Sequence, residues 1–259
     1  SANTGYRFSD RPEKTSTNIT GKWKAKFDGE DDENKYCVGL FNQEGNRVTG
    51  TFLTNTGDYR FLEGEISGMH LSLSAFDGAH SFLFIADVIN NEIKNGHFFS
   101  GLHWHDTWSA VRDSSFNLND ERSFSHLKEG YSKLEFSFPD VNGKMVSLAD
   151  SEFKNKVVIV QIMGSWCPNC LDETRYLSDW YNTTKPEDVR IIGLDYEKIT
   201  DTTVAFRNIR RLADRYHVNY PILFGGSSNR EEAGKTLPML SRVFSFPTTI
   251  YVNKDGTVR

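Results

Sequence analysis

The sequence predicts two domains of different fold class in a chain of 259 residues, which is longer than one typical domain. Residues 19–112 are expected to form an all-β antiparallel barrel or sandwich, because short aromatic and β-branched runs recur there with turn residues between them. Residues 133–259 are expected to form an α/β domain with a partly parallel sheet, because strand-like and helix-like segments alternate. The polar stretch 113–132 lacks both patterns and is interpreted as a linker.

Composition and charge limit the kinds of function to consider. With 37% hydrophobic and 25% charged residues, the composition is that of a soluble globular protein. The formal net charge of −5 argues against a nucleic-acid partner, because phosphate binding requires a basic face. No apolar run is long enough to span a bilayer.

Residues 1–18 are polar and without periodicity, which predicts an extended lead-in segment. They begin with Ser-Ala-Asn-Thr-Gly and contain neither the basic start nor the apolar core of a signal peptide. If the protein is exported, its signal segment has therefore been removed or is not part of this sequence.

The first domain is expected to contain eight short strands. Turn residues such as Asp28-Gly29 and Asp77-Gly78 separate them, which favours tight connections between antiparallel neighbours. The expected strands are 22–28, 35–42, 47–54, 58–65, 69–75, 80–88, 93–99 and 102–112. Gly21-Lys-Trp23, at the start of the first, resembles the Gly-x-Trp signature of lipocalin-like barrels, in which a Trp closes one end of the barrel.

A histidine cluster in this domain has two interpretations. In a strand, His103 and His105 point to the same face, as two ligands of one metal would, and His97 lies in the preceding strand. The alternative is surface histidines flanking a core filled by Trp104 and Trp108. The sequence favours this alternative, so no metal site is predicted.

The second domain is expected to begin with a hairpin and then to alternate strands with helices. Asp201 is a good N-cap for the helix that follows it. The expected strands are 134–138, 144–148, 157–163, 189–194, 220–224 and a late one within 244–252, and the expected helices are 167–182, one starting after Asp201, and a short one within 231–240.

One stretch of this domain carries the chemistry. Val157 to Met163 is almost continuously apolar, which predicts a strand buried on both faces. A Gly-Ser turn follows, and Pro168 fits the first turn of a helix, where a missing N–H costs nothing. Cys167 is therefore expected at the helix N-terminus, with Cys170 one turn inside it.

A Cys-x-x-Cys at a helix start is typical of a redox dithiol, half of a zinc site or haem attachment. Haem attachment requires His at position 171, which is Leu. Zinc requires two more soft ligands, and Cys37 is the one other cysteine. Cys37 is interpreted as a small buried hydrophobic residue, with an intermolecular disulfide as the alternative.

The redox interpretation requires a stabilised thiolate, because the thiolate is the attacking species. The N–H groups and macrodipole of the helix supply that stabilisation at Cys167, and Cys170 is then the buried resolving thiol. A purely structural disulfide is the alternative that the motif leaves open.

Several motifs together resemble the thioredoxin superfamily. Trp166-Cys-Pro-Asn-Cys170 after a buried strand resembles its active site, and Phe246-Pro247-Thr248 resembles its cis-proline loop. The hairpin Phe138-Pro-Asp-x-x-Gly-Lys144 and the element 196–224 are similar to the TlpA/ResA-like branch of extracytoplasmic thiol–disulfide oxidoreductases. The resemblance covers residues 133–259. It implies that the chain ends before the last strand and helix of a full thioredoxin fold.

The resemblance implies an enzyme without cofactor that exchanges disulfides with a protein partner. Cys167 attacks, Cys170 resolves, and an apolar lip of Trp166, Pro168 and the Phe246-Pro247 segment receives the partner's chain. A periplasmic or other extracytoplasmic location is implied, with an upstream membrane or periplasmic thiol donor and the option of a membrane anchor through a removed N-terminal segment. The direction of electron flow stays open.

The resemblance also assigns a role to Glu173. Cytoplasmic thioredoxins have a buried Asp six residues before the first cysteine, where this chain has Gln161, an amide that cannot relay a proton. The TlpA/ResA-like branch has a Glu three residues after the second cysteine, which is Glu173 here. Glu173 is thereby a candidate base for Cys170, and an ordinary exposed helix glutamate is the alternative.

Two other functions are compatible with the sequence. The barrel could hold an apolar ligand or a partner, with the second domain as a non-catalytic scaffold, and an aromatic-lined cavity would favour that function. A peroxidase is the third possibility, which the vicinal Trp-Cys-x-x-Cys dithiol disfavours.

Overall fold

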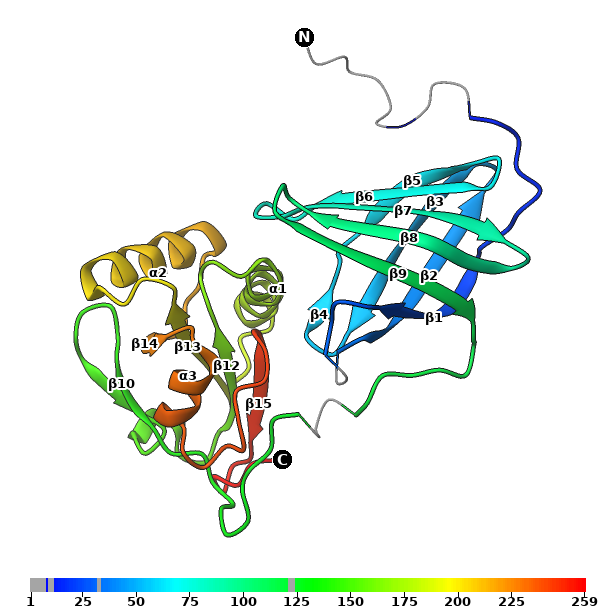
Figure 1. The fold of residues 1–259 in the computed structure, drawn as a ribbon. Helices are drawn as coiled ribbons and strands as arrows, with labels where there is room; N and C mark the ends of the chain where they lie inside the picture. Colours follow the sequence, from blue (N-terminus) through cyan, green and yellow to red (C-terminus); the bar gives the residue numbers. More distant parts are fainter. Residues whose placement is uncertain (1–7, 9–11, 32–33, 121–123) are drawn as a thin grey trace. The chain divides into compact units, whose positions relative to one another are not determined.

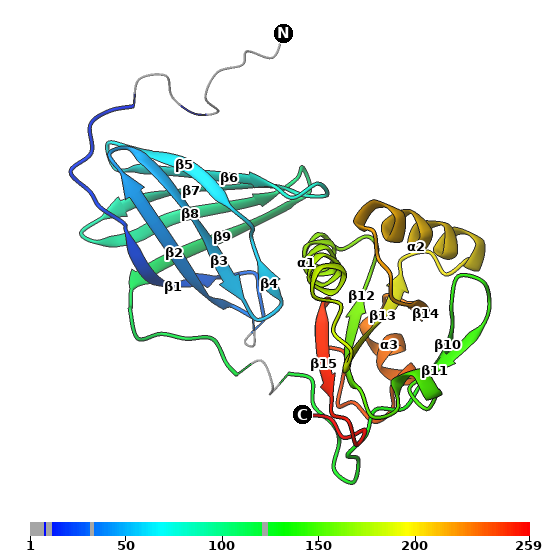
Figure 2. The same ribbon diagram turned by 180° about the vertical axis from the view of Figure 1, so that it is seen from behind.

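A computed structural model describes residues 8, 12–31, 34–120 and 124–259 and divides the chain into two compact units, Ser1–Asn119 and Asp120–Arg259 (Figures 1 and 2). Each unit has its own hydrophobic core. Of the expected lead-in, residues 1–7 and 9–11 lie outside the described residues.

The first unit is a closed antiparallel β-barrel (Figure 1). A barrel is one of the two all-β folds that the sequence predicts for this region. Its strands are β1 (Gly21–Phe27), β2 (Tyr36–Glu44), β3 (Arg47–Thr54), β4 (Gly57–Asp58), β5 (Leu62–Ser67), β6 (His70–Phe76), β7 (Ser81–Ile89), β8 (Glu92–Ser100) and β9 (Trp104–Arg112). The order is β2-β1-β9-β8-β7-β6-β5-β3, and β2 pairs with β3 to close the ring. The short β4 pairs with the end of β3.

The strand expected at 58–65 is interrupted in the structure. The chain leaves the sheet after Asp58 and returns at Leu62. Between them Arg60 has a φ of 64°, and its backbone N–H donates to Asp58 Oδ1 at 2.9 Å. The left-handed conformation of Arg60, held by the Asp58 carboxylate, explains why the strand is interrupted.

Aromatic rings fill the interior of the barrel. Phe52 is fully buried, and its ring centroid lies 4.9 Å from that of Phe84, 5.2 Å from Trp108 and 5.4 Å from Phe41. Most of these contacts are edge-to-face, the arrangement that aromatic quadrupoles favour. Side chains thus occupy the middle of the barrel, which does not favour a barrel that stores an apolar ligand.

Trp23 belongs to the buried core of the barrel. It is fully buried, and its Nε1 donates to the carbonyl of Ile19 at 2.8 Å. The guanidinium of Arg112 lies 4.6 Å from the ring centroid and donates to the carbonyls of Asn18 and Thr20. The segment before β1 is thereby fastened across the indole.

The histidine cluster lies on the outside of the barrel. His97 Nδ1 and His105 Nε2 are 3.0 Å apart, and both side chains are exposed. Across the described residues, no group of three or more His, Cys, Asp and Glu is arranged to hold a metal ion. The expectation that Trp104 fills the core is wrong: Trp104 is 51% exposed, because it is the first residue of β9, whereas Trp108 is buried.

The second unit is an α/β fold around a four-stranded sheet of order β14-β13-β12-β15 (Figure 2). Neighbours β12, β13 and β14 are parallel and β15 is antiparallel to β12, which confirms a partly parallel sheet. The elements are β10 (Ser137–Pro139), β11 (Met145–Ser147), a 3₁₀ turn (Ser151–Phe153), β12 (Val157–Met163), α1 (Pro168–Thr184), β13 (Val189–Glu197), α2 (Thr202–Tyr216), β14 (Ile222–Ser227), α3 (Arg230–Thr236) and β15 (Thr248–Val252).

Local signals define the ends of these helices. Asp201 is the N-cap of α2, and its Oδ1 accepts from the N–H of Val204 at 3.0 Å. Both α1 and α2 end at a residue in the left-handed conformation, Lys185 and His217. None of the helices in the described part of the chain has the length and apolarity to cross a membrane.

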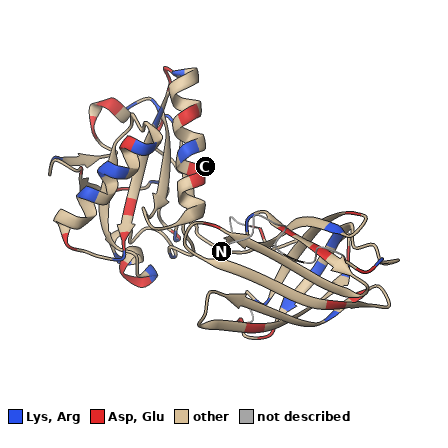
Figure 3. Ribbon diagram, turned by 90° about the horizontal axis from the view of Figure 1, so that it is seen from above, with Lys and Arg blue, Asp and Glu red and all other residues tan. Residues whose placement is uncertain are grey.

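The second half of the expected linker is packed on the second unit. Phe124 stacks on Phe244 with ring centroids 4.4 Å apart, and Leu127 bridges to Leu240. Residues 124–132 are therefore held by side-chain and backbone contacts. In each unit, basic and acidic residues are interspersed along the elements (Figure 3).

The barrel core sets the stability of the first unit. Replacing Phe52 with Ala removes a fully buried ring and leaves a cavity, so we expect a loss of about 3–5 kcal/mol in the free energy of unfolding of the barrel. Urea unfolding followed by near-UV circular dichroism measures it. Phe61→Ala is the matched control, because Phe61 is 93% exposed and its loss should change stability by less than about 0.5 kcal/mol. Equal effects of the two substitutions would contradict a packed interior.

Candidate active site

The two cysteines of the second unit lie at the start of α1. The buried strand β12 ends at Met163, a turn of three residues follows, and Cys167 is the N-cap of the helix. Its Sγ accepts from the backbone N–H of Cys170 at 3.3 Å. Cys167 is 5% exposed and Cys170 fully buried, so the first sulfur is the one nearer to solvent.

The environment separates the acidities of the two thiols. The Cys170 thiol and the N–H groups of Cys170 and Asn169 hydrogen-bond to Cys167 and lower its pKa, against the opposing effect of burial. Burial and the neighbouring Cys167 raise the pKa of Cys170. Cys167 is therefore the more acidic of the two thiols, and Cys170 holds its proton more strongly.

The loop before β15 lies against Cys167. The Sγ of Cys167 donates to the carbonyl of Phe246 at 3.4 Å, and the Phe246–Pro247 peptide bond is cis. The Trp166 and Phe246 rings meet edge to face with centroids 5.7 Å apart. Trp166, Phe246 and Pro247, predicted as parts of one lip, are thus adjacent to one another and to Cys167, and Pro168 is the first residue of the helix.

Glu173 points inward from α1, unlike an ordinary exposed helix glutamate. Its Oε2 accepts from Gln161 Nε2 at 2.8 Å, and its Oε1 accepts from Thr249 Oγ1 at 2.6 Å. Gln161 and Thr249 face each other in register on β12 and β15. The Gln161 amide is also 3.4 Å from the carbonyl of Cys170, so this network reaches the backbone of the buried cysteine.

Thr174 and Thr249 belong to this network and were not predicted from the sequence. Thr174 is fully buried and donates to Gln161 Oε1 at 3.1 Å. No motif marks either threonine, because the contacts depend on how α1 and β15 lie against β12. The one available signal was Gln161 itself, a polar residue in an apolar run that requires partners.

The end of β13 also supports the active-site turn. Trp166 Nε1 donates to the carbonyl of Tyr196 at 2.9 Å, and Lys198 Nζ lies 4.6 Å from the Trp166 ring centroid. Ser165 donates through its hydroxyl to Glu197. The strand expected from the sequence ends at residue 194, whereas β13 continues to Glu197, so these residues were not predicted to lie at the site. The signal was their place at the carboxyl end of a parallel strand, on the same sheet edge as the cysteines.

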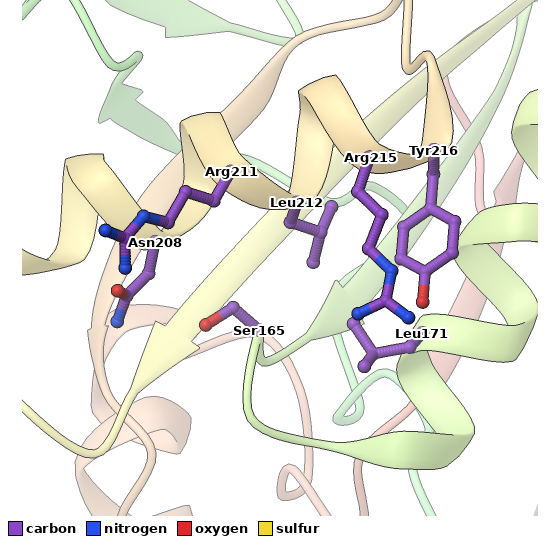
Figure 4. A pocket seen from close by; sticks show the side chains of 7 residues that line it. All are labelled: Ser165, Leu171, Asn208, Arg211, Leu212, Arg215 and Tyr216. Carbon is purple, nitrogen blue, oxygen red and sulfur yellow. The ribbon is translucent and has the colours of Figure 1, made fainter. Parts of the chain in front are cut away.

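A pocket of about 210 Å³ opens beside this turn, between α1 and α2 (Figure 4). Figure 4 shows Ser165 on the turn and Leu171 on α1 facing a row of α2 side chains. Its lining residues are Ser165, Leu171, Asn208, Arg211, Leu212, Arg215 and Tyr216. The cysteines do not line it, and Cys167 Sγ is directed to Phe246 instead.

The difference in pKa between the Cys167 and Cys170 thiols predicts selective alkylation. Iodoacetamide is expected to modify Cys167 at a lower pH than an ordinary thiol, whereas Cys170 and Cys37 stay unmodified in the folded protein, because burial raises the pKa of both. Glu173→Gln should lower the midpoint further, because the Glu173 charge raises the pKa of Cys167. Mass spectrometry of the alkylated peptides against pH measures both effects, and an unchanged or higher midpoint in the variant would contradict that influence of Glu173.

Comparisons with known proteins agree on the second half of the chain. The family model described as Redoxin matches residues 128–259. The thiol-disulfide oxidoreductase ResA of Bacillus subtilis is 27% identical over 132 residues, which are 51% of this chain and 65% of that protein. ResA of Bacillus cereus is 29% identical over 132 residues and is covered to 68%.

A solved structure, the thioredoxin domain of a thiol-disulfide oxidoreductase from Bacteroides vulgatus, is 21% identical with a TM-score of 0.40, covering 51% of this chain and 86% of that one. The redoxin match extends from the segment that packs on the second unit to the last residue, just over half of the chain. Because this family model covers more than half of the chain, the chain belongs to the redoxin family.

Proposed function

We propose that this protein is a thiol–disulfide oxidoreductase that reduces or exchanges disulfides in protein partners. The observation that carries the proposal is the placement of Cys167 at the N-cap of α1, with its pKa lowered, and of Cys170 one turn inside the helix. A stabilised thiolate beside a buried partner thiol is the arrangement that disulfide exchange requires.

The reaction proceeds in two exchanges. The Cys167 thiolate attacks one sulfur of the substrate disulfide, a mixed disulfide forms, and the other substrate sulfur leaves as a thiolate. Cys170 then loses its proton and attacks Cys167, which forms the Cys167–Cys170 disulfide and releases the second substrate sulfur. Two electrons pass to the substrate, and the reverse sequence oxidises it.

Glu173 is proposed as the base that assists Cys170. It lies three residues after Cys170 on α1, and its carboxylate is held on the inner side of the helix by Gln161 and Thr249. Since burial raises the pKa of Cys170, the second exchange depends on removal of this proton. The amide of Gln161 fixes the carboxylate and cannot take the proton itself.

The partner's chain is proposed to bind at the lip that Trp166, Pro168, Phe246 and Pro247 form next to Cys167. The apolar rings supply contact area and require no particular hydrogen-bonding groups on the partner, which suits a protein substrate in extended conformation. An oxidised dithiol needs a thiol donor, so the proposal includes an upstream membrane or periplasmic donor and an extracytoplasmic location, where substrate disulfides persist. A reduction potential near about −270 mV would indicate a reductant and one near about −120 mV an oxidant.

Removing the resolving thiol tests the reaction. Cys170→Ser is expected to accumulate a mixed disulfide with a disulfide-bearing protein substrate such as insulin, through Cys167, because the second exchange cannot occur. Non-reducing gels and peptide mass spectrometry detect the adduct. Cys167→Ser should form none, and Cys37→Ser should behave as the unsubstituted protein. Absence of the adduct, together with no insulin reduction by the unsubstituted protein, would refute the proposed function.

The role of Glu173 is tested by the lifetime of the mixed disulfide. Glu173→Gln is expected to prolong it by about 10²-fold or more at neutral pH, since a general base contributes about 10²–10⁴-fold. Rapid-quench measurements with a peptide disulfide give the lifetime. Asp179→Asn is the matched control, because Asp179 is an exposed acid on the same helix. If both variants resolve at the same rate, Glu173 is not the base.

A further inference from the structure

Two buried acids lie at the carboxyl end of β13, directly under the active-site turn. Asp195 and Glu197 are two residues apart in the strand, so their side chains point to the same face. Asp195 is fully buried and Glu197 is 3% exposed. Two ionised carboxylates this close in a dry site would repel strongly, so one of them must be neutral or share a counter-charge.

The hydrogen bonds distinguish the two acids. The Ser165 hydroxyl and Asn208 Nδ2 both donate to Glu197, one to each carboxylate oxygen. Among the described residues, neither oxygen of Asp195 accepts a hydrogen bond of full geometry, although the N–H of Ser165 lies near enough to favour its charged form. Glu197 therefore has the donors that an ionised carboxylate requires, and Asp195 does not.

The surrounding charges favour the same assignment. Burial and the Glu197 charge raise the pKa of Asp195 well above its usual range, and the N–H of Ser165 opposes this only in part. From α2, the residue facing the pair is the neutral Asn208, and the nearby cation Arg211 lies along the pocket with an exposed side chain (Figure 4). A protonated Asp195 can donate to Glu197, which satisfies both acids with a single negative charge.

The pair is connected to the reactive cysteine through the turn. Ser165, bonded to Glu197, precedes Cys167 by two residues, and the Trp166 indole is bonded to Tyr196, the residue between the acids. The turn also lies close to the strand at Gly164, where an added Cβ would be 2.9 Å from the Tyr196 carbonyl oxygen. The position of the turn therefore depends on the end of β13.

We propose that Asp195 is a positioning residue, which keeps a proton shared with Glu197 so that this singly charged pair holds the Ser165–Trp166 turn and thereby Cys167 in place. The test by disulfide exchange rests on the proposed function. The location of the proton and the alkylation of Cys167 can be measured whether or not the protein exchanges disulfides.

The first test locates the proton. In protein labelled with ¹³C at the carboxyl carbons, the Asp195 signal is expected at the position of a neutral acid at pH 7, and the Glu197 signal at that of a carboxylate. An ionised Asp195 at pH 7 would overturn the proposal. A shift of the Asp195 signal on addition of Ca²⁺, reversed by EDTA, would also overturn it, because a cation would then take the place of the proton.

The second test separates the proton from the mere presence of a side chain. Asp195→Asn keeps a neutral donor of the same shape, so Cys167 should keep its alkylation rate and its pH midpoint. Asp195→Ala removes the donor, and we expect the rate of exchange with a peptide disulfide to fall by roughly ten- to a hundredfold, as for a small misplacement of a reactive group. Asp214→Ala, which removes an exposed acid on α2, is the matched control and should have no effect.

The outcomes remain distinguishable if a variant or the reaction fails. If Asp195→Ala does not fold, the carboxyl signals and Asp195→Asn still test the proposal. A loss of Cys167 reactivity in a folded Asp195→Asn variant would overturn the role of the shared proton. Should the unsubstituted protein not exchange disulfides at all, the proposed function fails. The alkylation profile of Cys167 then still shows whether Asp195 positions it.

Discussion

The hydrogen bond from the N–H of Cys170 to the Sγ of Cys167 is the interaction on which the second unit depends chemically. It exists because a strand buried on both faces delivers the chain to the start of a helix, where backbone N–H groups lack partners. A sulfur placed there takes the role that a Ser or Asp oxygen has at an ordinary N-cap. The same bond that begins the helix thus stabilises the negative charge that the proposed exchange requires.

Three other segments, together with a side chain of α1 itself, hold this helix start, and each contributes a different kind of contact. The loop before β15 supplies a carbonyl to Cys167, and α1 itself supplies Glu173. Strand β12 supplies the amide of Gln161, and the end of β13 supplies the carboxylate of Glu197 and the carbonyl of Tyr196. Because β13, β12 and β15 are neighbours in the sheet, these contacts depend on the register of the three strands.

Local chemistry made most of the fold predictable from the sequence. The apolar run, the turn and Pro168 predict β12 and α1, and Asp201 predicts the start of α2, because each signal acts within one turn of the chain. The recurring turns predict an all-β unit, but closure into a barrel depends on β2 pairing with both β1 and β3, which no local pattern reports. Trp104 is a second case in which a local pattern is not sufficient. The alternation of the strand predicts Trp104 in the barrel core, but its position at the end of β9 exposes it.

The third cysteine, Cys37, differs from the other two in its surroundings. Cys37 lies in the closed barrel, fully buried, with its pKa raised by the absence of water. A chain that carries three exchangeable thiols can form an internal disulfide between the wrong pair. With Cys37 shielded by an aromatic core, Cys167 and Cys170 are the two thiols left for the proposed exchange, and the disulfide between them has no third thiol competing for it within the molecule.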